Sequence, residues 1–233
     1  MHVYVVADDA GREAGFVGEQ LENRGATLTY LERDELPAFA TLKDPALLLL
    51  LGSDLAAHEP ENADVVESES EFARNALDAG IPVMAICYGA QVLARALGGT
   101  SYRAPLPEPG WRVVETTDVA LCPPGPWPQL HKDVFVSPPT ATLLGESPMG
   151  HQSFVDESRK ARAIAWQFHP EVTADRFILW VDADADYYEA TGTDTDLLRK
   201  ETCEREAVNR ESAHKLTDAA LDYLLTKPLL TRP

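Results

Sequence analysis

The apolar run Ala46–Leu51, which contains five consecutive leucines, is the sequence feature that most restricts the fold. A strand with one face in water alternates apolar and polar residues, so an unbroken run predicts a strand buried on both faces. Similar runs occupy residues 3–7 and 82–86, and amphipathic helical patterns cover residues 14–24 and 64–79. Strands that alternate with helices predict an α/β fold, with an open, mostly parallel sheet and helices on both faces.

The remaining segments extend this pattern. Thr27–Leu31 is expected to be a second strand and Ala163–Gln167 a later one, whereas the proline-rich residues 104–140 predict an antiparallel hairpin region against the main sheet. After residue 173 the pattern becomes helical, and the polar residues 182–196 are expected to form a loop. The spacing of an amphipathic helix then returns at Leu216, Ala220, Tyr223 and Leu224.

The composition argues against several classes of function. The chain has 233 residues, with 20 Lys and Arg against 38 Asp and Glu, and a formal net charge of -18. Such an acidic surface repels phosphate backbones and anionic lipids, so we expect no nucleic-acid or membrane partner. The three cysteines form no disulfide framework and no CxxC metal motif, and no signal peptide is recognised. We expect a cytoplasmic protein with reduced thiols, no metal site and no cofactor.

A candidate nucleophile lies where one buried run ends. Within Ile81–Gln91 the expected strand ends at Cys87, Gly89 permits a tight turn, and a helix is expected over residues 91–97. A strand, turn and helix in this order expose the side chain at the turn, at the carboxyl end of the sheet. The helix N-terminus favours a negatively charged sulfur, and the N–H of Tyr88 would face an oxyanion on a substrate carbonyl. Most cytosolic cysteines are inert, so this interpretation needs a partner base.

A second motif, QFHPE at residues 167–171, contains that base. It follows an expected strand, so it belongs to the same edge of the sheet. His169 can act as a general base if its strand lies beside that of Cys87. Glu171 would accept the other imidazole N–H, fix the tautomer and stabilise the imidazolium. A lone HPE sequence is usually a surface turn, and only the two motifs together predict a Cys-His-Glu triad that hydrolyses an amide.

The runs GIPVMAICYGAQVLARALGG and AWQFHPEV resemble the class I glutamine amidotransferases, most closely free-standing proteins related to the amidotransferase domain of GMP synthase. The resemblance implies a flavodoxin-like amidotransferase domain over residues 1–185 and a C-terminal helical extension, residues 186–233, packed on it. It implies that Cys87, His169 and Glu171 hydrolyse the glutamine side-chain amide through a γ-glutamyl thioester and release ammonia. The residues that it places beside the substrate are Gly52, Ser53, Tyr88, Gln91, His131 and Asp133.

Two positions depart from the usual pattern of this family. Residues 52–54 are Gly-Ser-Asp where relatives often have Gly-Gly-Pro, and Lys132 stands where relatives usually have glycine. Both changes lie on the substrate side of the expected site. They therefore concern the identity of the substrate more than the chemistry of the triad.

Three functions are compatible with these residues. The first is a glutamine amidotransferase that supplies a separate synthetase subunit with ammonia, since the sequence contains no P-loop and no GxGxxG after its first strand. The second is a γ-glutamyl amide hydrolase, in which water alone receives the γ-glutamyl group. The third is a non-enzymatic binding or regulatory protein of the same fold, which the presence of all three triad residues disfavours. The expected ligand is thus glutamine or a γ-glutamyl amide.

Overall fold

The computed structural model describes residues 1–8 and 13–226 of the chain. Within this part, one sheet has its strands in the order β2-β1-β3-β4-β10-β9-β8-β6. Neighbouring strands from β2 to β10 are parallel, whereas β9, β8 and β6 continue the sheet in antiparallel pairs. The strands are β1 His2–Ala7, β2 Thr27–Glu32, β3 Pro45–Leu50, β4 Val83–Ile86, β6 Glu115–Thr116, β8 Thr142–Ser147, β9 Gly150–Asp156 and β10 Ala163–Trp166.

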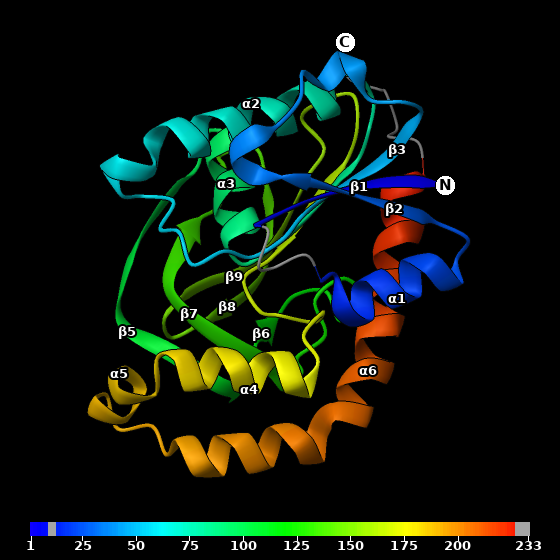
Figure 1. Ribbon diagram of the computed structural model, residues 1–233. Coiled ribbons are helices and arrows are strands. Elements are labelled where there is room, and N and C mark those ends of the chain that lie inside the picture. Colours follow the sequence, from blue (N-terminus) through cyan, green and yellow to red (C-terminus); the bar gives the residue numbers. More distant parts are fainter. Residues whose placement is uncertain (9–12, 227–233) are drawn as a thin grey trace.

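Helices cover both faces of the parallel strands (Figure 1). Helices α2 (Ala63–Asp78) and α3 (Tyr88–Ala96) lie on one face, and α1 (Gly15–Asn23) and α6 (Thr195–Leu225) lie on the other. The leucine run accounts for this division, because side chains of a strand point alternately to opposite faces. Those at 48 and 50 pack with α2 and α3, and those at 47 and 49 pack with α1 and α6. The predicted α/β class is confirmed.

A second, two-stranded sheet lies beside the main one. β5 (Thr100–Arg112) pairs antiparallel with β7 (Trp127–Val136), and the register is interrupted between Arg103 and Glu108. Phe135 of β7 packs edge-on against Phe154 of β9, with ring centroids 5.2 Å apart. This confirms the antiparallel hairpin region predicted from the proline-rich segment.

The prediction of a loop over residues 182–196 is wrong. α4 (Ala174–Ala183) runs into this segment, α5 (Ala185–Ala190) lies within it, and α6 begins at Thr195. The segment is polar on average, yet it contains Tyr188, which is 2% exposed. A single buried aromatic side chain gives no periodic signal in a sequence, so packing rather than pattern determines this helix.

Two further features differ from the sequence pattern. β8 and β9 are strands that no alternating run indicates, since Gly145, Pro148 and Gly150 interrupt the segment. α3 begins at Tyr88, directly after Cys87, and not at the later position that the periodicity predicts.

Single-turn helices η2 (Arg33–Glu35), η3 (Phe39–Thr41) and η4 (Pro60–Asn62) connect the regular elements. Among the described residues, no helix combines the length and apolar character needed to cross a membrane.

Candidate active site

Cys87 lies at the sharp turn between β4 and α3, at the carboxyl edge of the parallel strands. Its backbone has a φ of +52°, a conformation that residues with side chains rarely adopt. The turn is held because the N–H of Cys87 donates to the carbonyl oxygen of Trp166 at 2.8 Å. Gly89 is required, since a Cβ there would lie 2.4 Å from the carbonyl oxygen of Leu50. Tyr88 is the first residue of α3, so its N–H has no acceptor within the helix.

His169 and Glu171 lie beside this turn because β10 pairs with β4, with Trp166 opposite Ile86. Nδ1 of His169 is 2.7 Å from Oε1 of Glu171, and both side chains are buried. Burial alone would lower the pKa of His169. The charges of Glu171 and Cys87, and hydrogen bonds to both, outweigh burial and raise this pKa well above its ordinary value. The structure thus brings together the three residues predicted to form the triad.

The turn that carries Glu171 is fixed by helices from distant parts of the chain. From α1, the N–H of Phe16 donates to the carbonyl oxygen of Glu171 at 2.8 Å. Gly15 is equally close, because a Cβ there would lie 1.9 Å from the same oxygen. From α6, Nδ2 of Asn209 donates to the carbonyl oxygen of Val172 at 3.1 Å. Both helices on this face therefore hold the backbone of the turn that carries the carboxylate.

The loop after β3, which contains Gly52 and Ser53, packs on the cysteine and the histidine at Gly52. A Cβ on Gly52 would lie 3.2 Å from Cε1 of His169 and 3.6 Å from Cβ of Cys87. Ser53 continues the loop, and its Oγ accepts the N–H of Leu55 at 3.1 Å. A side chain at position 52 would therefore press on the imidazole, and glycine lets the backbone of this loop lie close to both residues.

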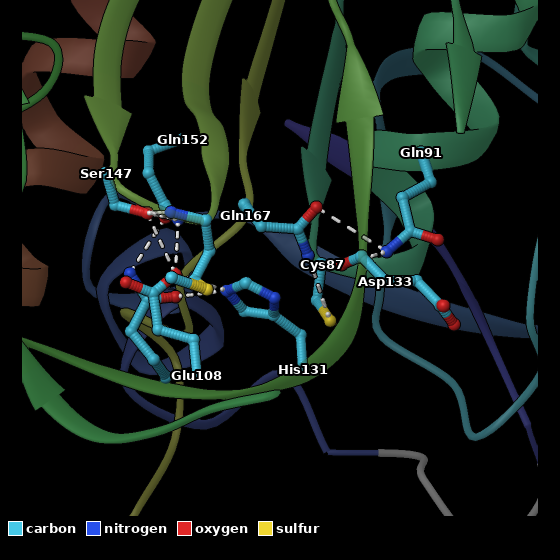
Figure 2. A network of polar contacts seen from close by, with 10 residues as sticks. Cys87, Gln91, Glu108, His131, Asp133, Ser147, Gln152 and Gln167 are labelled. Atoms are coloured by element: carbon cyan, nitrogen blue, oxygen red, sulfur yellow. Dashed lines mark hydrogen bonds and ion pairs between the residues drawn. The ribbon is translucent and has the colours of Figure 1, made fainter. Parts of the chain in front are cut away.

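Gln91 lies on the other side of Cys87, where Figure 2 shows it together with Gln167 and Asp133. Its Nε2 donates to the carbonyl oxygen of Asp133 at 3.2 Å and lies 3.5 Å from Oε1 of Gln167. Oε1 of Gln91 is buried and has no hydrogen-bond partner within the described chain. Nε2 of Gln167 donates to the sulfur of Cys87 at 3.6 Å. Gln167 belongs to the second motif, but no sequence argument assigned it this contact.

His131 belongs to a separate buried network, seen around Glu108 in Figure 2. Nε2 of His131 lies 2.8 Å from Oε1 of Gln129 and 3.4 Å from Oε2 of Glu108. Ser147 and Gln152 donate to that same Glu108 oxygen, at 2.9 and 3.0 Å. Both neighbours of Nε2 are acceptors, so Nε2 carries a proton, and the buried Nδ1 is without a partner among residues 1–8 and 13–226. No sequence motif indicates a buried carboxylate at Glu108.

α4 and α5 cover the site from outside. The ring of Trp180 in α4 packs on His169, with ring centroids 4.9 Å apart. Tyr188 in α5 is buried, and burial together with the nearby charges of Asp184 and Cys87 raises its pKa. Cys87 itself is only 6% exposed. The site is therefore closed by aromatic side chains in this conformation.

Lys132, one of the two departures from the family pattern, fastens α5 in this position. Its Nζ lies 2.7 Å from Oδ2 of Asp184, between α4 and α5. The same Nζ lies 4.6 Å from the centre of the Tyr187 ring, within the range of a cation–π interaction. A glycine at this position could make neither contact.

The groups assembled here suit covalent chemistry at a carbonyl carbon. A sulfur nucleophile, an imidazole within hydrogen-bond reach and a carboxylate that orients the imidazole are the components of acyl transfer. The described residues contain no group of three or more His, Cys, Asp or Glu side chains placed to hold a metal ion.

Fold and site together define a class of protein. The family model for glutamine amidotransferase class-I matches residues 17–177, a range that contains all three positions of the predicted triad, and the chain belongs to this family. A solved glutamine amidotransferase from Thermotoga maritima has a TM-score of 0.78 and 27% identity, over 94% of this chain and 96% of that chain. The predicted flavodoxin-like form of the sheet is thereby confirmed.

Curated relatives agree with this assignment over part of their length. The glutamine-hydrolysing GMP synthase of Tropheryma whipplei is 31% identical over 138 residues, which are 57% of this chain and 26% of the relative. That of Rhodopseudomonas palustris is 34% identical over 146 residues, 58% of this chain and 25% of the relative. The chain thus matches about a quarter of the length of these GMP synthases. The predicted resemblance to the GMP synthase amidotransferase is confirmed.

Proposed function

We propose that this protein hydrolyses the side-chain amide of glutamine through a γ-glutamyl thioester on Cys87 and releases ammonia for a separate acceptor enzyme. The observation that carries the proposal is the buried His169–Glu171 pair beside a sulfur at a helix N-terminus. The raised pKa of His169 favours a protonated imidazole beside a thiolate at Cys87, and the thiolate is the nucleophilic form of the cysteine. Membership of the glutamine amidotransferase family supports glutamine as the donor.

In the first half of the reaction, the thiolate of Cys87 attacks the amide carbon, and an electron pair moves to the carbonyl oxygen. The backbone N–H groups of Ser53 and Tyr88 are the proposed donors to this oxyanion. When the oxyanion collapses, the imidazolium of His169 gives its proton to the nitrogen and ammonia leaves. A γ-glutamyl thioester remains on the sulfur, and Glu171 keeps the neutral ring oriented.

In the second half, the neutral imidazole of His169 takes a proton from water, and the resulting hydroxide attacks the thioester carbon. The carbon–sulfur bond of the acylated Cys87 breaks and restores the thiolate. The free carboxyl group of the product, glutamate, then ionises in water. Oε1 of Gln91, an acceptor without a partner among the described residues, is the proposed acceptor for the α-ammonium group of the substrate.

The acceptor of ammonia is proposed to be a separate enzyme. The matched GMP synthases are about four times as long as their matched part, which supports activation of the acceptor by a part that this chain does not match. We therefore expect slow glutaminase activity from this chain, which rises when the partner synthetase is added. Steady turnover of γ-glutamyl amines with poor use of free glutamine would instead identify a γ-glutamyl amide hydrolase.

The experiment that tests the nucleophile is mass-spectrometric mapping of a diazo-ketone analogue of glutamine on wild type and on Cys87→Ala. We expect one adduct, on Cys87, which is absent from the variant. Cys203 is free and exposed, so it is an internal control for non-specific alkylation. Labelling confined to Cys203, or equal labelling of the two proteins, would contradict the proposal.

A further inference from the structure

A buried ion pair lies beneath the loop that follows β3. Arg33 of η2 is 2% exposed and Glu69 of α2 is fully buried. Nη1 of Arg33 lies 2.7 and 2.5 Å from the two carboxylate oxygens of Glu69, and Nε donates to Oδ1 of Asp8 at 2.8 Å. Desolvation offsets most of the attraction in such pairs, and apolar residues often replace them without loss of stability. Stability alone is therefore a weak reason for this pair.

The last guanidinium nitrogen of Arg33 contacts the active-site loop. Nη2 donates to the carbonyl oxygens of Leu51 and Gly52, both at 3.1 Å. The guanidinium carbon also lies 4.5 Å from the centre of the Tyr88 ring. The side chain of Arg33 thus contacts both proposed oxyanion donors' surroundings. It binds the two carbonyl groups just before Ser53, and it lies on the ring of Tyr88.

The contact with the carbonyl oxygen of Gly52 also determines the direction of the N–H of Ser53. In a planar trans peptide, the N–H of a residue points opposite to the preceding C=O. Because the C=O of Gly52 is held on Arg33, the N–H of Ser53 points away from Arg33. The groups that face the loop at Gly52 are Cys87 and His169, at the distances given above.

We propose that Arg33, held by Glu69, is a positioning residue that orients the oxyanion-binding N–H groups of Ser53 and Tyr88. This rests on the proposed function, in which those N–H groups stabilise the tetrahedral intermediate. A guanidinium suits the task because its donors are fixed in one plane and it stays charged. A lysine keeps the charge but cannot donate to Glu69 and to both carbonyls with the same geometry.

The test compares two reactions of Cys87 in an Arg33→Lys variant, with Cys203→Ser as the common background. Acylation by p-nitrophenyl acetate passes through a tetrahedral oxyanion, whereas alkylation by iodoacetamide displaces iodide and forms none. Neither reagent needs glutamine binding. We expect acylation to fall by about 10- to 100-fold, below the loss of roughly 10²–10³ seen when an oxyanion donor is removed outright. Alkylation should stay within about twofold of the background protein, since the thiolate itself is unchanged.

Arg162→Lys is a matched control. Nε of Arg162 pairs with Glu157 at 3.0 Å, and Nη1 donates to the carbonyl oxygen of Tyr223 at 2.8 Å. Its guanidinium carbon lies 4.7 Å from the Tyr223 ring, so the same three kinds of contact are present. Arg162 precedes β10, at the end of that strand opposite to His169. We expect both reactions of Cys87 to be unchanged in this variant.

Glu69→Gln is the second variant, and it decides the test if Arg33→Lys fails to fold by circular dichroism. It keeps the side-chain volume and weakens the hold on Arg33, so a several-fold loss of acylation with unchanged alkylation is expected. On glutamine, the loss should appear in kcat and leave KM within about twofold, because the oxyanion forms only after binding.

Three results would overturn the proposal. Normal acylation in a folded Arg33→Lys protein would show that the N–H groups need no support from Arg33. Equal losses of acylation and alkylation would show that Arg33 supports the whole turn at Cys87. The same acylation loss in Arg162→Lys would make the effect one of stability. A background protein that is acylated by the ester but does not hydrolyse glutamine contradicts the proposed function alone, and the two variants still decide the role of Arg33.

Discussion

Nδ1 of His169 lies 2.7 Å from Oε1 of Glu171, with only Pro170 between them in the chain. The pair is therefore built within one short turn, and the rest of the fold has to supply only the sulfur and a fixed backbone. The N–H of His169 donates to the carbonyl oxygen of Pro128 at 2.9 Å, and α1 and α6 hold the turn on its other side. The protonation of the imidazole thus depends on a carboxylate whose backbone is held on both sides.

The first prediction concerns reactivity after Glu171→Gln. Burial lowers the pKa of His169, and the charge of Glu171 is the largest influence that raises it. Removing this charge should lower the pKa of His169. A smaller fraction of the protein then has a protonated His169 beside a deprotonated Cys87 at neutral pH. We expect the alkylation of Cys87 by iodoacetamide near pH 7 to slow by about tenfold per unit of lost pKa. An unchanged rate between pH 6 and pH 8 would contradict this account.

The second prediction concerns stability in the same variant. Because the pKa of His169 is raised in the folded state, its contribution to stability is complete below its unfolded pKa, about 6.5, and is lost as pH rises through the folded pKa. The difference in unfolding free energy between wild type and Glu171→Gln should therefore be largest near pH 6 and shrink at higher pH. Urea denaturation measures it.

A matched control for both experiments is Glu146→Gln. Glu146 also faces a histidine, since its Oε1 lies 3.7 Å from Nε2 of His151, but this pair is at the surface. Exposed pairs contribute little, so this variant should follow the wild-type profile at every pH. A stability difference for Glu171→Gln that stays constant or grows with pH would show that the carboxylate acts mainly through packing.

The third prediction is that Gly89→Ala destabilises the protein and disables the site. A Cβ at this position would lie 2.4 Å from the carbonyl oxygen of Leu50, a backbone atom at the carboxyl end of β3. We expect a loss of about 2–3 kcal/mol in the unfolding free energy, typical of overpacking, and slow acylation of Cys87. Gly80→Ala is the control, because Gly80 has a φ of +84° but no atom within 4 Å of its Cβ position. It should lose only about 1 kcal/mol from the left-handed conformation and keep its activity. Gly89 lies in α3 and has no positive φ, so a loss no larger than that of Gly80→Ala would contradict the predicted clash with Leu50.

The sequence alone predicts those parts of this site that are formed by residues close together in the chain. The turn at Cys87 and the pair at His169 and Glu171 are each set by a strand end and the few residues after it, so local patterns predict them. Arg33 and Glu69 meet only after η2 and α2 pack together, and no spacing rule connects an arginine after one strand with a glutamate in a later helix. Buried polar partners of this kind are properties of tertiary contacts.

The helix α5, which covers the site, could not be predicted from the sequence for a related reason. Lys132 departs from the family pattern, and only the folded structure shows that it contacts Asp184 next to α5. Glu108 is similar, since a carboxylate among prolines looks like a solvated residue until Ser147 and Gln152 donate to it. Averages over polar segments favour loops, and they miss a single buried side chain such as Tyr188.

The fourth prediction is that Gln91→Leu weakens substrate binding without disabling the nucleophile. The variant has an apolar side chain of similar size, without the unpaired Oε1 and without the hydrogen bond to the carbonyl oxygen of Asp133. A lost hydrogen bond to a charged substrate group is worth about 1.5–3 kcal/mol, so KM for glutamine should rise by roughly 10- to 100-fold. Acylation by p-nitrophenyl acetate, which has no ammonium group, should change little. A normal KM would remove Gln91 from the binding site.

The fifth prediction is that Lys132→Met opens the site. The ion pair with Asp184 and the cation–π contact with Tyr187 together are worth about 1 kcal/mol at a partly exposed position, which corresponds to roughly a fivefold change in the open population. We expect iodoacetamide to alkylate Cys87 about fivefold faster. Loss of a nearby positive charge by itself would make the thiolate less available, so an increase in rate identifies the opening of α5.

Arg199→Met is the control for this last experiment. Nε of Arg199 lies 2.7 Å from Oδ1 of Asp182, so it joins α6 to α4 by an ion pair of the same length and similar exposure. It contacts neither tyrosine of α5, and the alkylation rate of Cys87 should stay at the wild-type value. Equal acceleration in both variants would mean that the whole C-terminal segment loosens when any surface ion pair is lost. No acceleration in Lys132→Met would show that the packing of Tyr188, and not Lys132, keeps α5 closed over the sulfur.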